Sequence, residues 1–211
     1  MTEPDLASAI SSRICHDLVS PVGAIVNGVD LIREIGMGDF QDELGMISQS
    51  ATRASSLLQF YRIAFGTAED NDAEIARPVL QNQAQSLIDT GRISLEWPDA
   101  SGPALKRAEA RLLFQMLMCC RASLGMRGFV SVDLAPTGSF PVSVTAEAVG
   151  LGENPAELNP DIARLLETEP DAATLPPRLI EFALIRASAA RLNVVLTTER
   201  HGASLSVIAT G

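Results

Sequence analysis

The sequence is short of positive charge. Lys106 is its single lysine, and the 16 basic residues face 26 acidic ones, so the formal net charge is −10. A field of that sign repels nucleic acid and anionic lipid, so we expect no nucleic acid and no membrane surface as a partner. The expected partner is another protein.

Cysteines and long apolar runs are also scarce. The three cysteines are Cys15, Cys119 and Cys120, and their spacing suits neither a disulfide framework nor a zinc site. No apolar run approaches the roughly 20 residues that cross a bilayer. The N-terminus carries Glu3 and Asp5, where a secretory signal needs basic residues. We therefore predict a cytoplasmic protein without a bound metal.

What the sequence does contain is a pair of long amphipathic helices. From Leu6 to Ile35 apolar residues recur every three or four positions, which is the period of a helix. Gly36, Met37 and Gly38 break this pattern, and Asp39 is expected to cap a second helix. The apolar stripe of the first helix comprises Ile10, Ile14, Leu18, Val22, Ile25, Val29 and Ile32, and that of the second Phe40, Leu44, Ile47, Ala51, Ala54, Leu58, Tyr61 and Phe65.

These two helices predict a hairpin with more apolar surface than it can cover by itself. Val19 and Val26 widen the stripe of the first helix. A two-fold dimer in which two hairpins form a four-helix bundle would bury that surface. We therefore predict a homodimer through residues 5–66.

The remainder of the chain predicts a second, mixed domain. The segment 66–75 is short and acidic and is interpreted as a linker. It divides the chain into a hairpin domain over 1–70 and a second domain over 76–211. The pattern there predicts helices near 77–90, 104–124, 160–168 and 176–192, and strands at 93–97, 128–135, 142–149, 194–199 and 204–209. The predicted fold class is α+β, with an α/β sandwich following the hairpin.

The candidate reactive residue is His16. At about 100° per residue it falls opposite the apolar stripe of the first helix and faces solvent. The residues that share its face are small, so a partner surface could lie flat against the imidazole. They are Ser12, Ser20, Gly23 and Asn27. This pattern is typical of a docking face.

Imidazole is a nucleophile near neutral pH, and a phosphoryl group on its nitrogen is labile enough to pass on to a carboxylate. Asp17 is the neighbour expected to tune the ring, although adjacent residues do not share a helix face, so its help is expected to be indirect. Arg13 and Ser20 lie one turn before and after His16, where they could contact a phosphoryl group. At that position Ser20 leaves a phosphatase direction open.

The run His16-Asp17-Leu18-Val19-Ser20-Pro21 resembles the phospho-acceptor box of histidine kinases. The longer run Ser12–Ile25 is similar to the ChpT-type histidine phosphotransferases of bacterial phosphorelays. The resemblance implies a dimer that displays two phospho-accepting histidines. Each would accept a phosphoryl group from a receiver-domain aspartate, such as that of a hybrid kinase, and pass it to a response-regulator aspartate. The receivers would supply the Mg²⁺.

By the same resemblance, the second domain is similar to a histidine-kinase ATP-binding domain that has lost its nucleotide motifs. Gln115, Cys119, Cys120 and Ser123 stand on the helix where the kinases carry asparagine. Ala148 takes the place of an aspartate before Gly150 and Gly152, and 175–179 reads Leu-Pro-Pro-Arg-Leu where a glycine box is needed. Proline offers no amide donor to a phosphate. We therefore expect no ATP binding and no bound cofactor.

Two other functions remain open on the sequence alone. The hairpin could be the association module of a non-catalytic dimeric adaptor for signalling proteins, with His16 incidental. Less favoured is an ATP-dependent histidine kinase. A Ser-His-Asp hydrolase is excluded, because His16 and Asp17 are adjacent on one helix and the chain has no G-x-S-x-G elbow.

Overall fold

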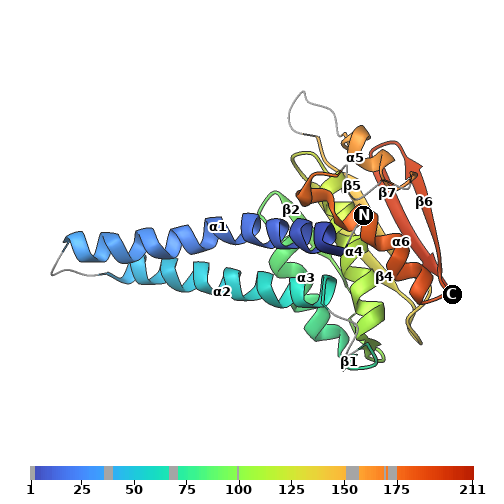
Figure 1. Cartoon of the computed structure of the whole chain (residues 1–211), viewed down its shortest axis with the longest axis horizontal. Coiled ribbons are helices and arrows are strands. Elements are labelled where there is room, and N and C mark those ends of the chain that lie inside the picture. Colours follow the sequence, from blue (N-terminus) through green and yellow to red (C-terminus); the bar gives the residue numbers. More distant parts are fainter. Residues whose placement is uncertain are drawn as a thin grey trace.

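The structure is a computed structural model that describes residues 3–35, 40–66, 71–98, 100–150, 157–168, 170 and 175–211. An N-terminal helical hairpin projects from a sandwich of helices and one main sheet (Figure 1). This is the predicted α+β architecture. None of the helices in these ranges is long and apolar enough to cross a membrane.

The hairpin consists of α1 (Glu3–Ile35) and α2 (Gln41–Ala64). Both predicted helices are confirmed. Asp39, the expected cap of the second helix, lies outside the described residues; α2 begins after Phe40, which makes no capping hydrogen bond through its side chain. The helices approach closely at Gly28, where a Cβ atom would lie 2.7 Å from Cγ1 of Ile47.

The main sheet has five strands: β2 (Ile93–Glu96), β4 (Gly128–Leu134), β5 (Val142–Ala148), β6 (Val195–His201) and β7 (Ser204–Thr210). Their order is β2-β4-β5-β7-β6, with β2 and β4 parallel and every other pair antiparallel. Residues alternate between buried and more exposed along β4 and β5, as expected for a sheet with one face on the core.

Several element boundaries differ from the predicted ones. The predicted linker ends in β1 (Glu74–Ile75), which pairs with β3 (Leu105–Lys106), so these residues are tied to the second domain. The segment predicted as one helix over 176–192 is a 3₁₀ turn, η2 (Pro177–Leu179), followed by α6 (Glu181–Arg191). The remaining helices are α3 (Arg77–Ile88), α4 (Arg107–Ser123) and α5 (Pro160–Arg164), so the helix predicted over 160–168 ends early.

The base of the hairpin packs into the core of the sandwich. On α2 the buried side chains gather at the C-terminal end, and the ring of Phe60 stacks on Phe114 of α4 at 4.4 Å between centroids and 14° between planes. At the opposite end of the hairpin, Leu31, Leu44 and Met46 are exposed. This packing places the first turns of α1 beside η2 and the start of α6 (Figure 1).

Candidate functional site

His16 lies on α1 with 78% of its side chain exposed. Ser12, Ser20 and Asn27 are exposed near it, and a Cβ atom added at Gly23 would meet nothing within 4 Å. The structure therefore brings the predicted face together on one side of α1, with no tall side chain among its members.

Asp17 contacts the imidazole directly. Oδ1 of its carboxyl lies 2.9 Å from Nδ1 of His16, so the contact is direct, although adjacent residues do not share a helix face. A carboxylate can only accept a hydrogen bond, so Nδ1 carries the proton and Nε2 keeps its lone pair. The nucleophilic nitrogen is thereby assigned from this hydrogen bond as Nε2.

The second carboxylate oxygen of Asp17 faces α2 and the preceding turn of α1. Oδ2 accepts a hydrogen bond from the hydroxyl of Tyr61 and lies 3.1 Å from Nε of Arg13. Burial works to raise the pKa of Asp17, but hydrogen bonds from Tyr61 and His16 and the charge of Arg13 outweigh it, and the pKa is lowered. Asp17 is therefore held as an anion beside the imidazole.

Arg13 does not lie where the sequence placed it. Its side chain is 9% exposed, and its Nη1 donates to the carbonyl of Arg178 in η2. The expectation that Arg13 faces a phosphoryl group on His16 is therefore corrected. Its guanidinium joins Asp17 to the second domain, because the start of α1 packs against η2.

Sequence reasoning missed the part that Tyr61 takes in this site. It assigned Tyr61 to the apolar stripe of the second helix, and the side chain is indeed buried, at 2% exposure. A signal was present, however, because a buried tyrosine hydroxyl needs a hydrogen-bond partner. Burial raises the pKa of Tyr61, as does the hydrogen bond to Asp17, despite the opposing charge of Arg13. The phenol is therefore held as a donor.

A groove of about 850 Å³ begins one turn beyond His16. It runs between α1, α2 and the end of α3, and small polar side chains predominate along it. They include Ser20, Ser48, Thr52, Ser56 and Ser86. The groove and the exposed face around His16 share Ser20, so they form one continuous surface.

The α4 positions that stand where histidine kinases carry asparagine are buried in the core. Gln115 donates from Nε2 to the carbonyl of Ala64 at 2.9 Å, and Ser123 donates to the carbonyl of Cys119. Cys119 and Cys120 are fully buried, and burial raises the pKa of both thiols, that of Cys120 to about 12. All four side chains are thus enclosed by the core and are not exposed to a ligand.

The two other segments that stand where histidine kinases carry nucleotide motifs also pack against the rest of the protein. Ala148 ends β5 with its side chain buried, while Gly152 lies outside the described residues. Pro177 begins η2, the turn whose Arg178 carbonyl accepts from Arg13. The segment that would need glycines for phosphate binding thus contacts α1 in this chain. In the described ranges no group of three histidine, cysteine or acidic side chains is placed to hold a metal ion.

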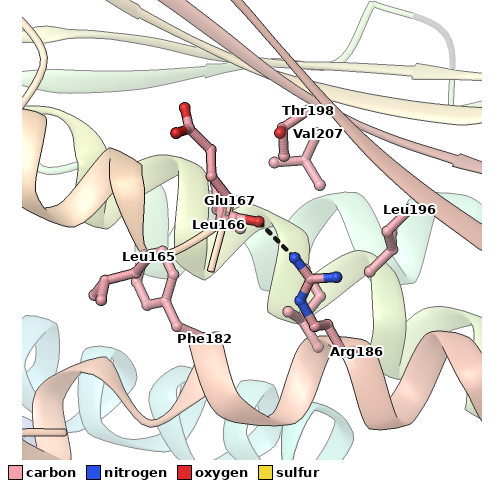
Figure 2. A pocket seen from close by; sticks show the side chains of 9 residues that line it. Leu165, Leu166, Glu167, Phe182, Arg186, Leu196, Thr198 and Val207 are labelled. Atoms are coloured by element: carbon pink, nitrogen blue, oxygen red, sulfur yellow. Dashed lines mark hydrogen bonds between the residues drawn. The ribbon is translucent and has the colours of Figure 1, made fainter. Parts of the chain in front are cut away.

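A separate pocket of about 230 Å³ lies between the α5–α6 region and strands β6 and β7 (Figure 2). Phe182, Leu196 and Val207 give it apolar walls. Figure 2 shows the guanidinium of Arg186 turned toward Leu166, whose carbonyl accepts from Nη2 at 3.0 Å. None of the predicted site residues lines this pocket, so the chemistry of His16 does not involve it.

Comparisons with known proteins identify the family of the chain. The family model of the histidine phosphotransferase C-terminal domain matches residues 78–204, more than half of the chain. Protein phosphotransferase ChpT of Brucella abortus (strain 2308) is 36% identical over 137 residues, which cover 65% of this chain and 64% of that relative.

A solved structure gives the same picture of the fold. A bacterial phosphotransferase superposes with a TM-score of 0.72 over 99% of this chain and 97% of that chain, at 24% identity. The resemblance drawn from the sequence is confirmed: the chain belongs to the family of the histidine phosphotransferase C-terminal domain.

Proposed function

We propose that this protein is a histidine phosphotransferase of a bacterial phosphorelay. His16 accepts a phosphoryl group from the aspartate of one receiver domain, such as that of a hybrid kinase, and passes it to the aspartate of a response regulator. The observation that carries the proposal is the exposed imidazole whose Nδ1 is bonded to Asp17 at 2.9 Å, which leaves Nε2 open to a partner. Membership of the family and the similarity to ChpT support it.

The chemistry follows from the tautomer. The lone pair of Nε2 attacks phosphorus, a P–N bond forms, and the P–O bond to the receiver aspartate breaks, returning that residue to a carboxylate. The ring gains positive charge while Nδ1 keeps its proton, and the carboxylate of Asp17 stabilises that charge. Transfer to the second receiver reverses these steps, so the P–N bond breaks and a new P–O bond forms.

In this proposal the protein uses no ATP and holds no cofactor of its own. The Mg²⁺ that shields the phosphoryl oxygens comes with the receiver domain. Burial of Gln115, Cys119 and Ser123 in the α4 core supports this reading, since none of them is exposed to meet a nucleotide. The proposed location is the cytoplasm, the reducing compartment that suits the three free cysteines.

The receiver docks on the face around His16. Ser12, Gly23 and Asn27 leave room for a flat partner surface, and the groove that begins at Ser20 offers hydroxyl groups along α1 and α2. Ser20 is exposed one helical turn after His16, so it is the residue through which a phosphatase direction would act. The net charge of −10 excludes neither partner, because recognition at a face of small residues depends on local shape.

The protein acts as a homodimer. A stripe of apolar side chains on α1 is left exposed by the single chain: Val19, Val22, Val26 and Val29. On α2 Leu44, Met46 and Leu58 are exposed as well. An apolar surface of this extent is costly in water, and pairing two hairpins into a four-helix bundle would bury it while leaving His16 on the outside.

The test is transfer of radiolabelled phosphate from a phosphorylated receiver domain, with Mg²⁺ present and ATP absent. We expect the wild type to take up label that is lost in acid and retained in base, as phosphohistidine is. His16→Ala removes the nucleophile, so uptake should be abolished while the fold is retained.

His201→Ala is the matched control, because His201 is the other histidine of the chain and ends β6 far along the sequence from α1. Its uptake should equal that of the wild type. No label on the wild type from a broad receiver panel, with partner binding unchanged in His16→Ala, would favour the adaptor instead. ATP binding at physiological concentrations would favour the kinase.

A further inference from the structure

The aspartate beside His16 needs an anchor in order to act on the imidazole. Adjacent residues point to different sides of a helix, and the terminal torsion of an aspartate is soft. Even so, Oδ1 of Asp17 meets Nδ1 of His16 at 2.9 Å. Some other group must therefore hold the carboxylate in this orientation.

We propose that Tyr61 is a positioning residue for phosphoryl transfer: its hydroxyl, together with Arg13, holds Asp17 so that one carboxylate oxygen fixes the tautomer of His16. The proposal rests on the proposed function, and it assigns each carboxylate oxygen one task. Oδ1 accepts from the imidazole, and Oδ2 accepts from Tyr61 and pairs with Arg13 at 3.1 Å.

Tyr61 is itself held rigidly. Its ring stacks on Phe65 at 5.5 Å with an interplanar angle of 11° and meets the edge of Phe60 at 5.8 Å and 90°. With 2% of its surface exposed, the phenol has little freedom to leave Asp17. The hydrogen bond therefore costs little further ordering when it forms, which is what a positioning group requires.

Arg13 extends this arrangement into the second domain. Its Nε pairs with Asp17, and its Nη1 donates to the carbonyl of Arg178 in η2. Residues 165 positions apart in the chain are joined in this way. The second domain, which we propose binds no nucleotide, thus helps to orient the phospho-accepting histidine through the backbone of η2.

Tyr61→Phe tests the proposal, since it removes the hydroxyl and keeps the ring that packs on Phe60 and Phe65. The chain contains only two histidines, His16 and His201, so selective ¹⁵N labelling of histidine gives two imidazoles, and His201→Gln assigns them. We expect the wild type to show His16 with its proton on Nδ1, and Tyr61→Phe to show a mixture of both tautomers. The transfer rate should fall about tenfold.

Two further variants separate positioning from general loss of stability. Thr145→Val is the matched control, because Thr145 shares a side-chain hydrogen bond with Ser206 at 2.8 Å across the sheet; its tautomer and transfer rate should equal those of the wild type. Asp17→Asn should disturb the tautomer as Tyr61→Phe does. Adding Tyr61→Phe to Asp17→Asn should then cost nothing more, because both act through one carboxylate.

The possible outcomes are distinct. If the wild type takes up label but Tyr61→Phe leaves the tautomer or the transfer rate unchanged, Tyr61 is not a positioning residue, and the proposed function stands. Additive losses in the double variant would also overturn the proposal. If the wild type takes up no label, the proposed function fails and the proposal fails with it, whatever the tautomer spectrum shows.

Discussion

α1 and α4 are both long helices rich in apolar residues, yet they have opposite surroundings. In α4, residues 110–120 are buried without interruption, together with Ser123. Among the described side chains of α1, only Arg13, Pro21 and Gly28 are buried. The buried surface is thus concentrated in α4, while His16, the proposed phospho-acceptor, lies on a helix that the single chain leaves largely uncovered.

The largest expected effect is the loss of stability when the packing of α4 is disrupted and α1 is unchanged. Phe114→Ala removes a fully buried ring that stacks on Phe60, and the cavity should lower the free energy of unfolding by about 3–5 kcal/mol, measured by urea denaturation.

On α1, Val26→Asp places a charge in the exposed apolar stripe. It should halve the mass measured by light scattering and keep the helical circular dichroism of the wild type.

The contrast between a stabilising α4 and a dimerising α1 would be wrong if Val26→Asp unfolded the protein or if the variant remained a dimer. Because dimerisation stabilises the folded chain by mass action, thermal unfolding of the wild type should depend on protein concentration, and that of Val26→Asp should not.

An intermediate effect is expected at Glu181, where α6 meets α1. The side chain is fully buried, and burial raises the pKa of its carboxyl from 4.5 to about 7, against the opposing charge of Arg13. Between these two values the folded state binds more protons than the unfolded state, so stability falls as the pH rises from about 4.5 to 7. Glu181→Gln should remove this pH-dependent loss of stability, because an amide does not ionise.

The free energy of unfolding of Glu181→Gln, relative to that of the wild type, should therefore rise by on the order of 2 kcal/mol between pH 5 and pH 8. Denaturant unfolding at the two pH values measures the gain. The same substitution at the exposed Glu199 is the matched control, and an equal gain there would trace the effect to net charge rather than to burial.

The smallest effect compares two glycines of α1 itself. At Gly28 a Cβ atom would lie 2.7 Å from Ile47, whereas at Gly23 it would meet nothing. Gly28→Ala should destabilise the protein by about 1 kcal/mol, since the clash exceeds the gain in helix propensity. Gly23→Ala should stabilise it by up to about 1 kcal/mol. Thermal unfolding of both variants measures the difference, and equal shifts would contradict the close approach of α1 and α2.

Much of the fold could be predicted from periodicity and turn chemistry. The spacing of apolar residues located α1, α2 and the five strands of the main sheet, and the residues around Gly202, whose φ is 57°, form the turn between the last two strands, β6 and β7. The exposure of His16 followed from its angular position opposite Ile14 and Ile25. These features depend on neighbours within a few residues, which is the range over which the sequence pattern is informative.

The contacts of Asp17 could not be predicted in this way. Its partner Tyr61 lies 44 positions away, and Arg13 reaches a backbone carbonyl 165 positions away. Such contacts depend on how the hairpin rests on the sandwich, and helical periodicity contains no information about that. For the same reason Arg13 was expected at the reactive face, although the second domain covers it.

The stack of Phe60 on Phe114 has a consequence for how such proteins diversify. In the proposed function the hairpin carries the surface that selects partners, and recombination between paralogues could then exchange that surface. A hairpin from another protein would, however, bring its own side chain to the position of Phe60 and leave a hole or a clash against α4. New partner specificity should therefore arise by point substitutions along the exposed face of α1, with the base of the hairpin inherited together with its sandwich.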